Sequence, residues 1–146
     1  MITEVKSVKE VIARGAEVCN PSRVAVSEEA LEGVKSGAKF AQQGDIYVRK
    51  LDAVPKGYIK SENHDGQLAP GTTRGSRHCV DPNKVDIYVR QEAPRGEAVL
   101  EGPVLYAEER FDIMHPEHGW VSIPGLQFYQ ITYQRAFADE IRRVMD

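Results

Sequence analysis

The chain has 146 residues, of which 41% are hydrophobic and 28% charged, and its formal net charge is −3. This length suits a single domain, and this composition supports a buried core and excludes wholesale disorder. The slightly acidic balance leaves no strong case for a nucleic-acid partner, and the absence of a long apolar run leaves none for a membrane.

Residues 1–43 are expected to form an N-terminal arm with one or two short helices. The first residues lack the apolar stretch of a signal peptide, which predicts a cytoplasmic protein. Ser7 and Ser27 are N-cap candidates, and Glu10 completes a capping box with Ser7. Arms of this kind order on contact with a neighbour, so the arm is a candidate for contacts with other subunits or with a second copy of the chain.

Residues 44–146 are expected to form a β domain, because the apolar period changes to two from Gly44 onward. Gly and Pro turns separate seven or eight short apolar segments, and no helical segment lies between them. The pattern predicts a mainly β fold, an antiparallel β-barrel or sandwich, that ends in a short helix over 138–144. The expected strands lie near 46–49, 58–59, 85–91, 104–106, 111–114, 121–123 and 127–134.

The alternation also predicts which side chains form the core. One face of each strand carries the apolar residues, and large aromatic residues are expected beside them. The expected core contains Ile46, Val48, Ile87, Val89, Ile113 and Ile131, joined by Trp120, Tyr129 and Tyr133.

The sequence DIYVR occurs twice, at 45–49 and again at 86–90. A repeat of this spacing is compatible with an internal duplication. The flanking residues do not match, and Ile, Tyr and Val are common strand formers, so two strands with similar pairing needs explain the echo more simply.

The two cysteines, Cys19 and Cys79, are expected to be reduced thiols, as is usual in the cytoplasm. A disulfide between them is the less favoured alternative. Cys79 follows His78 directly, so a role as a thiolate metal ligand is a further alternative.

Three histidines and one glutamate are the strongest candidates for chemistry. His115, Glu117 and His118 share one short turn, and His78 stands at the start of another predicted strand. Three such ligands with an open position suit a divalent metal, zinc or iron, and Glu117 is the candidate fourth ligand or general base. The simpler alternative is a hairpin whose histidines bond to backbone, and metal-free acid–base use is the third.

A second candidate is the polar loop that precedes His78. Arg74 and Arg77 offer planar guanidinium groups and Ser76 offers a hydroxyl, which suits a phosphate or carboxylate. The loop does not match a phosphate-binding P-loop, and a solvated surface loop is an equal alternative.

Several short motifs together resemble a family of small bacterial and phage proteins without established activity. The resemblance covers residues 43–146 and rests on QGDI at 43–46, SRH at 76–78, HPEH at 115–118, IPG at 123–125 and QR at 134–135. Family members carry a GHxH element where this chain has Ser76 and only His78. The resemblance implies a β domain and no mechanism, and the substitution removes one candidate metal ligand.

Three functions therefore stay open, and whether the protein is an enzyme is undecided. The first is a metal-binding β domain that uses the histidine set. The second is a phage virion or other assembly protein, a homo-oligomer joined through the arm. The third is a metal-free phosphodiester-cleaving enzyme without a cofactor, in which histidines act as acid and base.

Overall fold

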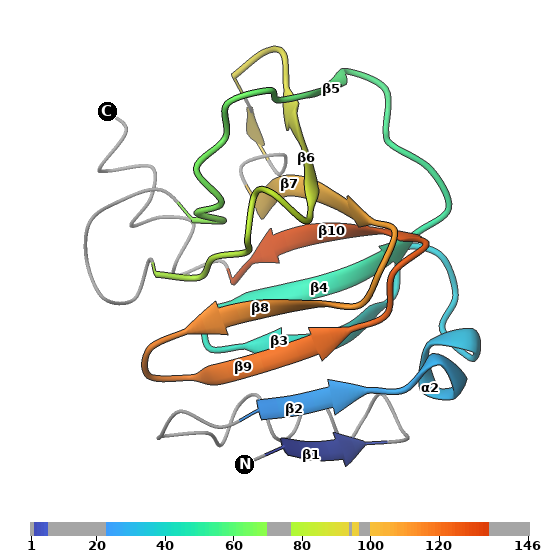
Figure 1. Ribbon diagram of the computed structural model, residues 1–146. Helices are drawn as coiled ribbons and strands as arrows, with labels where there is room; N and C mark the ends of the chain where they lie inside the picture. The colour runs from blue at the N-terminus through green and yellow to red at the C-terminus, as the bar shows by residue number, and fades with distance from the viewer. Residues whose placement is uncertain (1, 6–22, 70–76, 94, 97–99, 135–146) are drawn as a thin grey trace.

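A computed structural model of the chain describes residues 2–5, 23–69, 77–93, 95–96 and 100–134 (Figure 1). Within these ranges the fold is almost entirely β, as the apolar alternation predicts, and no helix there is long and apolar enough to span a membrane. The elements are β1 (Ile2–Val5), β2 (Arg23–Val26), α2 (Glu28–Glu32), β3 (Lys39–Gln43), β4 (Ile46–Leu51), β5 (Tyr58–Lys60), β6 (Asp86–Arg90), β7 (Glu101–Ala107), β8 (Phe111–His115), β9 (Gly119–Ile123) and β10 (Gln127–Tyr133).

The strands form two sheets, which we call the small sheet and the large sheet. The small sheet has the order β1-β2-β9-β8, and the large sheet has the order β3-β4-β10-β7-β6-β5. Neither order closes on itself within the described residues, so the architecture is the sandwich and not the barrel. The small sheet lies against the part of the large sheet that contains β3 and β4 (Figure 1).

The core lies between the two sheets. Phe40 from β3 and Phe111 from β8 both pack on Tyr129 of β10, with ring centroids 5.4 Å and 5.9 Å from its ring. Five of the predicted core residues are confirmed as buried, and Val89 is partly buried against the same cluster. The confirmed residues are Ile46, Val48, Ile87, Ile113 and Ile131, together with the predicted tyrosines Tyr129 and Tyr133.

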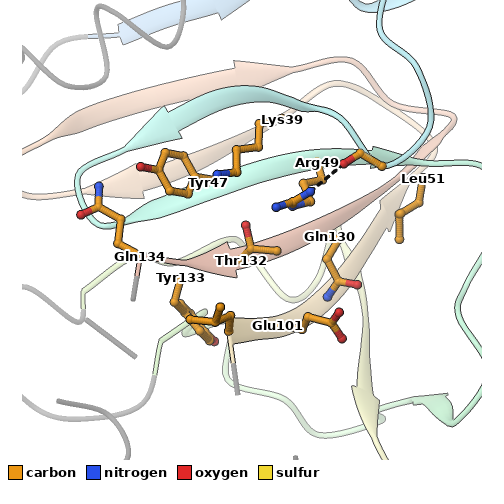
Figure 2. A pocket seen from close by; sticks show the side chains of 11 residues that line it. Lys39, Tyr47, Arg49, Leu51, Glu101, Gln130, Thr132, Tyr133 and Gln134 are labelled. Atoms are coloured by element: carbon orange, nitrogen blue, oxygen red, sulfur yellow. Dashed lines mark hydrogen bonds between the residues drawn. The ribbon is translucent and has the colours of Figure 1, made fainter. Parts of the chain in front are cut away.

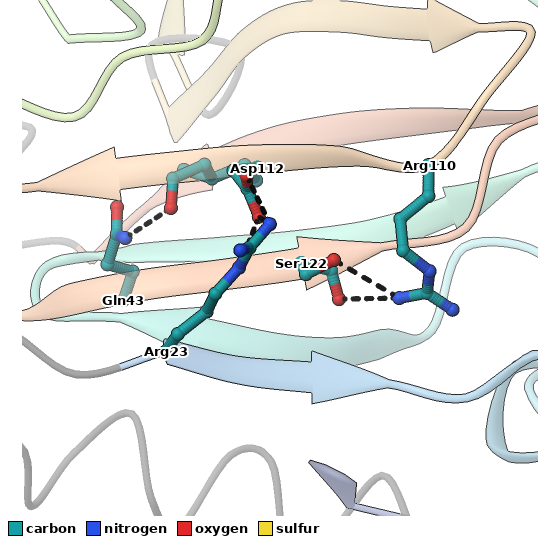
Figure 3. A network of polar contacts seen from close by, with 6 residues as sticks. Arg23, Gln43, Arg110, Asp112 and Ser122 are labelled. Carbon is teal, nitrogen blue, oxygen red and sulfur yellow. Dashed lines mark hydrogen bonds and ion pairs between the residues drawn. The ribbon is translucent and has the colours of Figure 1, made fainter. Parts of the chain in front are cut away.

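The expectation that Trp120 belongs to the core is wrong. Its side chain is 41% exposed, because Val121 takes the inward-facing position next to it in β9. The Arg23 guanidinium lies 5.8 Å from the indole centroid on the outer face of the small sheet. The same Arg23 donates to both carboxylate oxygens of Asp112 in β8, at 2.9 and 2.7 Å, and so spans β9 (Figure 3).

The described part of the arm is built into the sandwich. Ser27 caps α2 as predicted, since its hydroxyl accepts a hydrogen bond from the Ala30 N–H at 3.1 Å. Two strands that the sequence pattern did not predict flank this helix: β2 joins the small sheet, and β3 forms a hairpin with β4 across the expected boundary at residue 43. The helices expected over 7–14 and 138–144 lie outside the described residues.

The pairing around β2 departs from the expected antiparallel pattern. β2 runs parallel to both of its neighbours, β1 and β9, whereas every other strand pair in the described sheets is antiparallel. A parallel neighbour needs no tight turn, so it can come from a distant part of the chain. Local turn signals therefore do not reveal this pairing.

Candidate histidine cluster

His115 and His118 belong to the tight turn between β8 and β9. The Nδ1 atom of His115 accepts hydrogen bonds from the backbone N–H groups of Glu117, at 3.0 Å, and of His118, at 3.1 Å. A ring nitrogen that accepts carries no proton, so neutral His115 carries its proton on Nε2. The two bonds hold the turn and fix the His115 ring in the interior, where the residue is 1% exposed.

His78 reaches the same place through a short extension of the small sheet. Cys79 forms an isolated bridge with Met114 beyond the edge of β8, with N–H to carbonyl distances of 3.0 and 2.8 Å. This bridge sets His78 beside His115, and their ring centroids are 4.4 Å apart. His78 is 0% exposed, so both imidazoles lie in the protein interior.

His118 completes the group of three rings. Its centroid lies 4.4 Å from that of His115 and 6.1 Å from that of His78. The ring fits because residue 44, in the β3–β4 turn, is a glycine with φ of +55°. A Cβ atom at Gly44 would lie 2.4 Å from Cδ2 of His118, far inside contact distance.

Gln43 connects the cluster to the two sheets. Its Nε2 donates to the carbonyls of Ile113, at 2.9 Å, and Gly119, at 2.6 Å. Two carbonyl acceptors fix the orientation of the amide, so Oε1 is the atom that faces Nδ1 of His78 at 2.8 Å. His78 Nδ1 must then donate, which leaves the Nε2 of neutral His78 unprotonated.

The structure thus brings together the three predicted histidines, while the other predicted site residues take different places. Glu117 is half-buried in the shared turn, and its N–H donates to His115. The Arg77 side chain is exposed and lines an open cavity of about 570 Å³ beside Cys79. Arg74 and Ser76 lie outside the described residues.

Cys79 is a free thiol, as expected. Burial raises the pKa of the Cys79 thiol, the positive charge of Arg77 opposes this, and the negative charge of Asp65 adds to it. A raised pKa favours the protonated thiol over the thiolate that metal ligation requires.

Gln43 and Gly44 are residues of the candidate site that sequence reasoning did not assign. Both belong to the QGD motif on which the family resemblance partly rests, so their motif was visible without their role. The structure now gives the role: the amide orients one histidine, and the missing Cβ admits another.

The three ring centroids lie 4.4 to 6.1 Å apart, near the spacing of imidazoles that share one ion. Because Zn–N bonds are about 2 Å long, imidazoles on one tetrahedral zinc have centroids about 5 Å apart. In the described ranges no set of three His, Cys, Asp or Glu side chains is arranged to hold a metal ion. Neutral His115 also presents a proton and not a lone pair at Nε2, because its Nδ1 accepts both backbone bonds.

A family described as a domain of unknown function, DUF8820, has a sequence model that matches residues 42–134. The matched segment begins beside Gln43 and ends at Gln134, whose N–H donates to the Asp45 carbonyl at 3.1 Å. It therefore contains all three clustered histidines and both motif residues that shape their site. No curated protein and no solved structure matches the chain.

Proposed function

The chain belongs to the DUF8820 family, and we propose that its function depends on a divalent transition-metal ion, zinc or iron, bound at His78, His115 and His118. One observation carries the proposal: imidazoles from two distant segments meet in the interior, with ring centroids 4.4 to 6.1 Å apart. Neutral imidazole nitrogens are common ligands of zinc and iron.

The contact between Gln43 and His78 supports this proposal. Histidine ligands of metals commonly donate their second ring N–H to an oxygen atom, which fixes the tautomer and the ring orientation. The Gln43 amide oxygen accepts such a bond from His78 Nδ1 at 2.8 Å. His78 therefore has the tautomer that a ligand binding through Nε2 requires.

His115 has the opposite tautomer, and this determines the order in which ligands are recruited. His78 and His118 bind first. His115 is slower to bind because its Nδ1 accepts two backbone hydrogen bonds, which the ring would have to give up. His115 joins as a third ligand through Nε2 only if its proton moves from Nε2 to Nδ1 and the two backbone bonds to Nδ1 are given up. Because the proton only changes ring nitrogen, neutral His115 binds the ion without releasing a proton.

Glu117 gives the proposed ion a possible chemistry. Its carboxylate belongs to the same turn as His115 and His118. An ion with an open position lowers the pKa of a bound water, and a nearby carboxylate can accept its proton. Glu117 is thus the proposed general base, and hydrolysis is the reaction class to screen once an ion is found.

The test is metal binding by the full chain after treatment with a chelator. Calorimetry with zinc or iron(II) should show one saturable site. An ion held at 100 times its Kd stabilises the native state by about 2.7 kcal/mol, which raises Tm by about 5–10 °C for a chain of this size. The double variant His115→Ala/His118→Ala should lose both effects.

His64 offers a matched control for these variants. It is the fourth histidine, and its Nδ1 accepts from the Gly66 N–H at 2.9 Å in a turn outside the cluster. His64→Ala should keep full metal affinity. The metal proposal fails if saturating zinc and iron(II) leave Tm unchanged, or if His64→Ala loses as much affinity as the cluster variants. In either case the histidines have a structural role, and their hydrogen bonds stabilise the packing of the hairpins.

A further inference from the structure

The outer face of the large sheet contains a groove that the histidine cluster does not use. This groove has a volume of about 700 Å³ and lies over β3, β4, β10 and the start of β7 (Figure 2). Most of the side chains that line it alternate along β4 and β10 with those that face the core, such as Val48 and Ile131. It is therefore a feature of the opposite side of the sheet from the sandwich interior.

A buried hydroxyl is aimed into this groove. Thr132 of β10 is only 5% exposed, and its Oγ1 has no hydrogen-bond partner among the described residues. Figure 2 shows this hydroxyl pointing toward the Arg49 side of the groove. A buried hydroxyl without a hydrogen-bond partner costs free energy. A ligand oxygen at this position would accept its hydrogen bond and offset that cost.

Arg49 of β4 is a diagonal neighbour of Thr132, whose direct partner in β4 is Tyr47, and it is only partly engaged. Its Nη1 donates to the Gly37 carbonyl at 2.8 Å, which anchors one corner of the guanidinium. Its Nε is buried and has no hydrogen-bond partner in the part of the chain that the structure describes. An anchored guanidinium with an unused N–H is prepared to bind an oxyanion with little loss of side-chain freedom.

The charges around the groove also favour an anion. The Lys39 ammonium lies 4.1 Å from the centroid of the Tyr47 ring, on the same face as Arg49. Among the described residues that line the groove the one carboxylate is Glu101, and it is already bonded to the guanidinium of Arg90. Two cations thus face the groove while its acidic group is neutralised.

We propose that this groove binds the oxyanion group of a small molecule, a carboxylate or a phosphate. Arg49 Nε and the Thr132 hydroxyl donate to the oxyanion, and Lys39 adds positive charge from the groove wall. The proposal does not depend on a metal ion, because none of these residues belongs to the histidine cluster.

The test is an NMR titration of the full chain with acetate and, separately, with inorganic phosphate, at constant ionic strength. The amide signals of β4 and β10 should shift saturably with at least one of the two anions. Saturation by acetate alone assigns a carboxylate ligand, and saturation by phosphate alone assigns a phosphate ligand. Holding ionic strength constant separates specific binding from general screening.

Three variants make the result specific. Arg49→Gln should weaken binding about tenfold, because it removes a charge-assisted hydrogen bond. Thr132→Val should weaken it several-fold while leaving Tm unchanged or higher, since it removes a hydroxyl that bonds to none of the described residues. Lys60→Gln removes the same charge as Arg49→Gln from β5, outside the groove, and should change affinity less than about twofold.

Two results would overturn the proposal. One is the absence of any saturable shift with either anion. The other is an equal loss of affinity in Arg49→Gln and Lys60→Gln, which would mean that the anion responds to overall charge and not to the groove.

Discussion

At the scale of single residues, Gly44 meets two demands at once. Its φ of +55° favours glycine, and a Cβ atom there would collide with the His118 ring. Gly44→Ala should therefore lower the free energy of unfolding in two ways. The left-handed backbone conformation should cost about 1–2 kcal/mol, and the collision with the His118 ring should cost about 1–3 kcal/mol more. Denaturant unfolding measures the total.

Gly57 separates the two terms. Its φ is +90°, but nothing lies within 4 Å of a Cβ built there, so Gly57→Ala should lose only the conformational term. Adding His118→Ala to Gly44→Ala should recover the stability lost through the collision, because the ring that the new Cβ would meet is then absent. Equal losses in Gly44→Ala and Gly57→Ala would show that the His118 ring does not occupy the position described.

Cys79 provides a prediction about pH. Because burial raises the pKa of its thiol, the folded chain keeps this proton at a pH where the unfolded chain releases it. In a Cys19→Ser variant, the rate of alkylation by iodoacetamide should rise with a midpoint above the usual thiol value of about 8.5. The stability that this thiol contributes is full below the unfolded pKa and is lost as pH rises above it.

The charge of Arg77 supplies the control for this measurement. Its guanidinium lowers the pKa of the Cys79 thiol, so Arg77→Gln should move the alkylation midpoint to still higher pH. A midpoint in the folded chain below that of the same variant in urea would contradict the effect of burial.

The sequence predicted the histidine cluster better than the residues around it. A five-residue turn brings His115 and His118 close in any hairpin, and a strand start is a natural place for His78. Gln43 gave no comparable signal, because two of its partners are backbone carbonyls of Ile113 and Gly119. Which carbonyls face a given side chain depends on strand register between distant segments, and residue type does not encode it.

At the scale of elements, β6 tests the predicted faces of the strands. Ile87 is 2% exposed, whereas Val89, two residues further on the same face, is only partly buried. Ile87→Ala should destabilise the fold by about 2–5 kcal/mol, and Val89→Ala by about 1 kcal/mol or less. Urea unfolding curves of the two variants provide the comparison, and a larger loss for Val89→Ala would contradict the described burial.

Strands β2 and β3 show where prediction from local pattern ends. β2 has four residues, Arg23–Val26, and its apolar alternation is too short to stand out beside the helix signal at Ser27. β3 is buried along most of its length and carries two glutamines, so it does not alternate between polar and apolar residues. Both strands are selected by their tertiary partners, which a single sequence does not reveal.

At the scale of the whole molecule, the repeated DIYVR segments occupy corresponding places. They form most of β4 and β6, which flank the central pair β10 and β7 in the large sheet. Each DIYVR strand also has an edge strand on its outer side, β3 or β5. Similar strand-pairing requirements at these two positions account for the repeated DIYVR sequence, with or without an internal duplication.

The family match begins inside β3, yet the sandwich extends beyond it toward the N-terminus. A fragment of residues 42–134 would lack Val24, Val26, Leu31 and Phe40, all of which belong to the buried core. It would also leave β9 without its neighbour β2. This fragment should not unfold cooperatively in calorimetry, in contrast to the full chain. A sharp transition in the fragment would show that the arm is dispensable.

The parallel contact between β2 and β9 also determines when the protein can fold during its synthesis. Val24 pairs with Val121, and β4 needs β10, so neither sheet can be completed until a strand about 80 to 100 residues further along the chain has been synthesised. Until then only the local hairpins are available, and the nascent chain carries strand edges without their final neighbours. Such long-range pairing predicts slow folding, with the nascent chain exposed to aggregation until β10 has emerged.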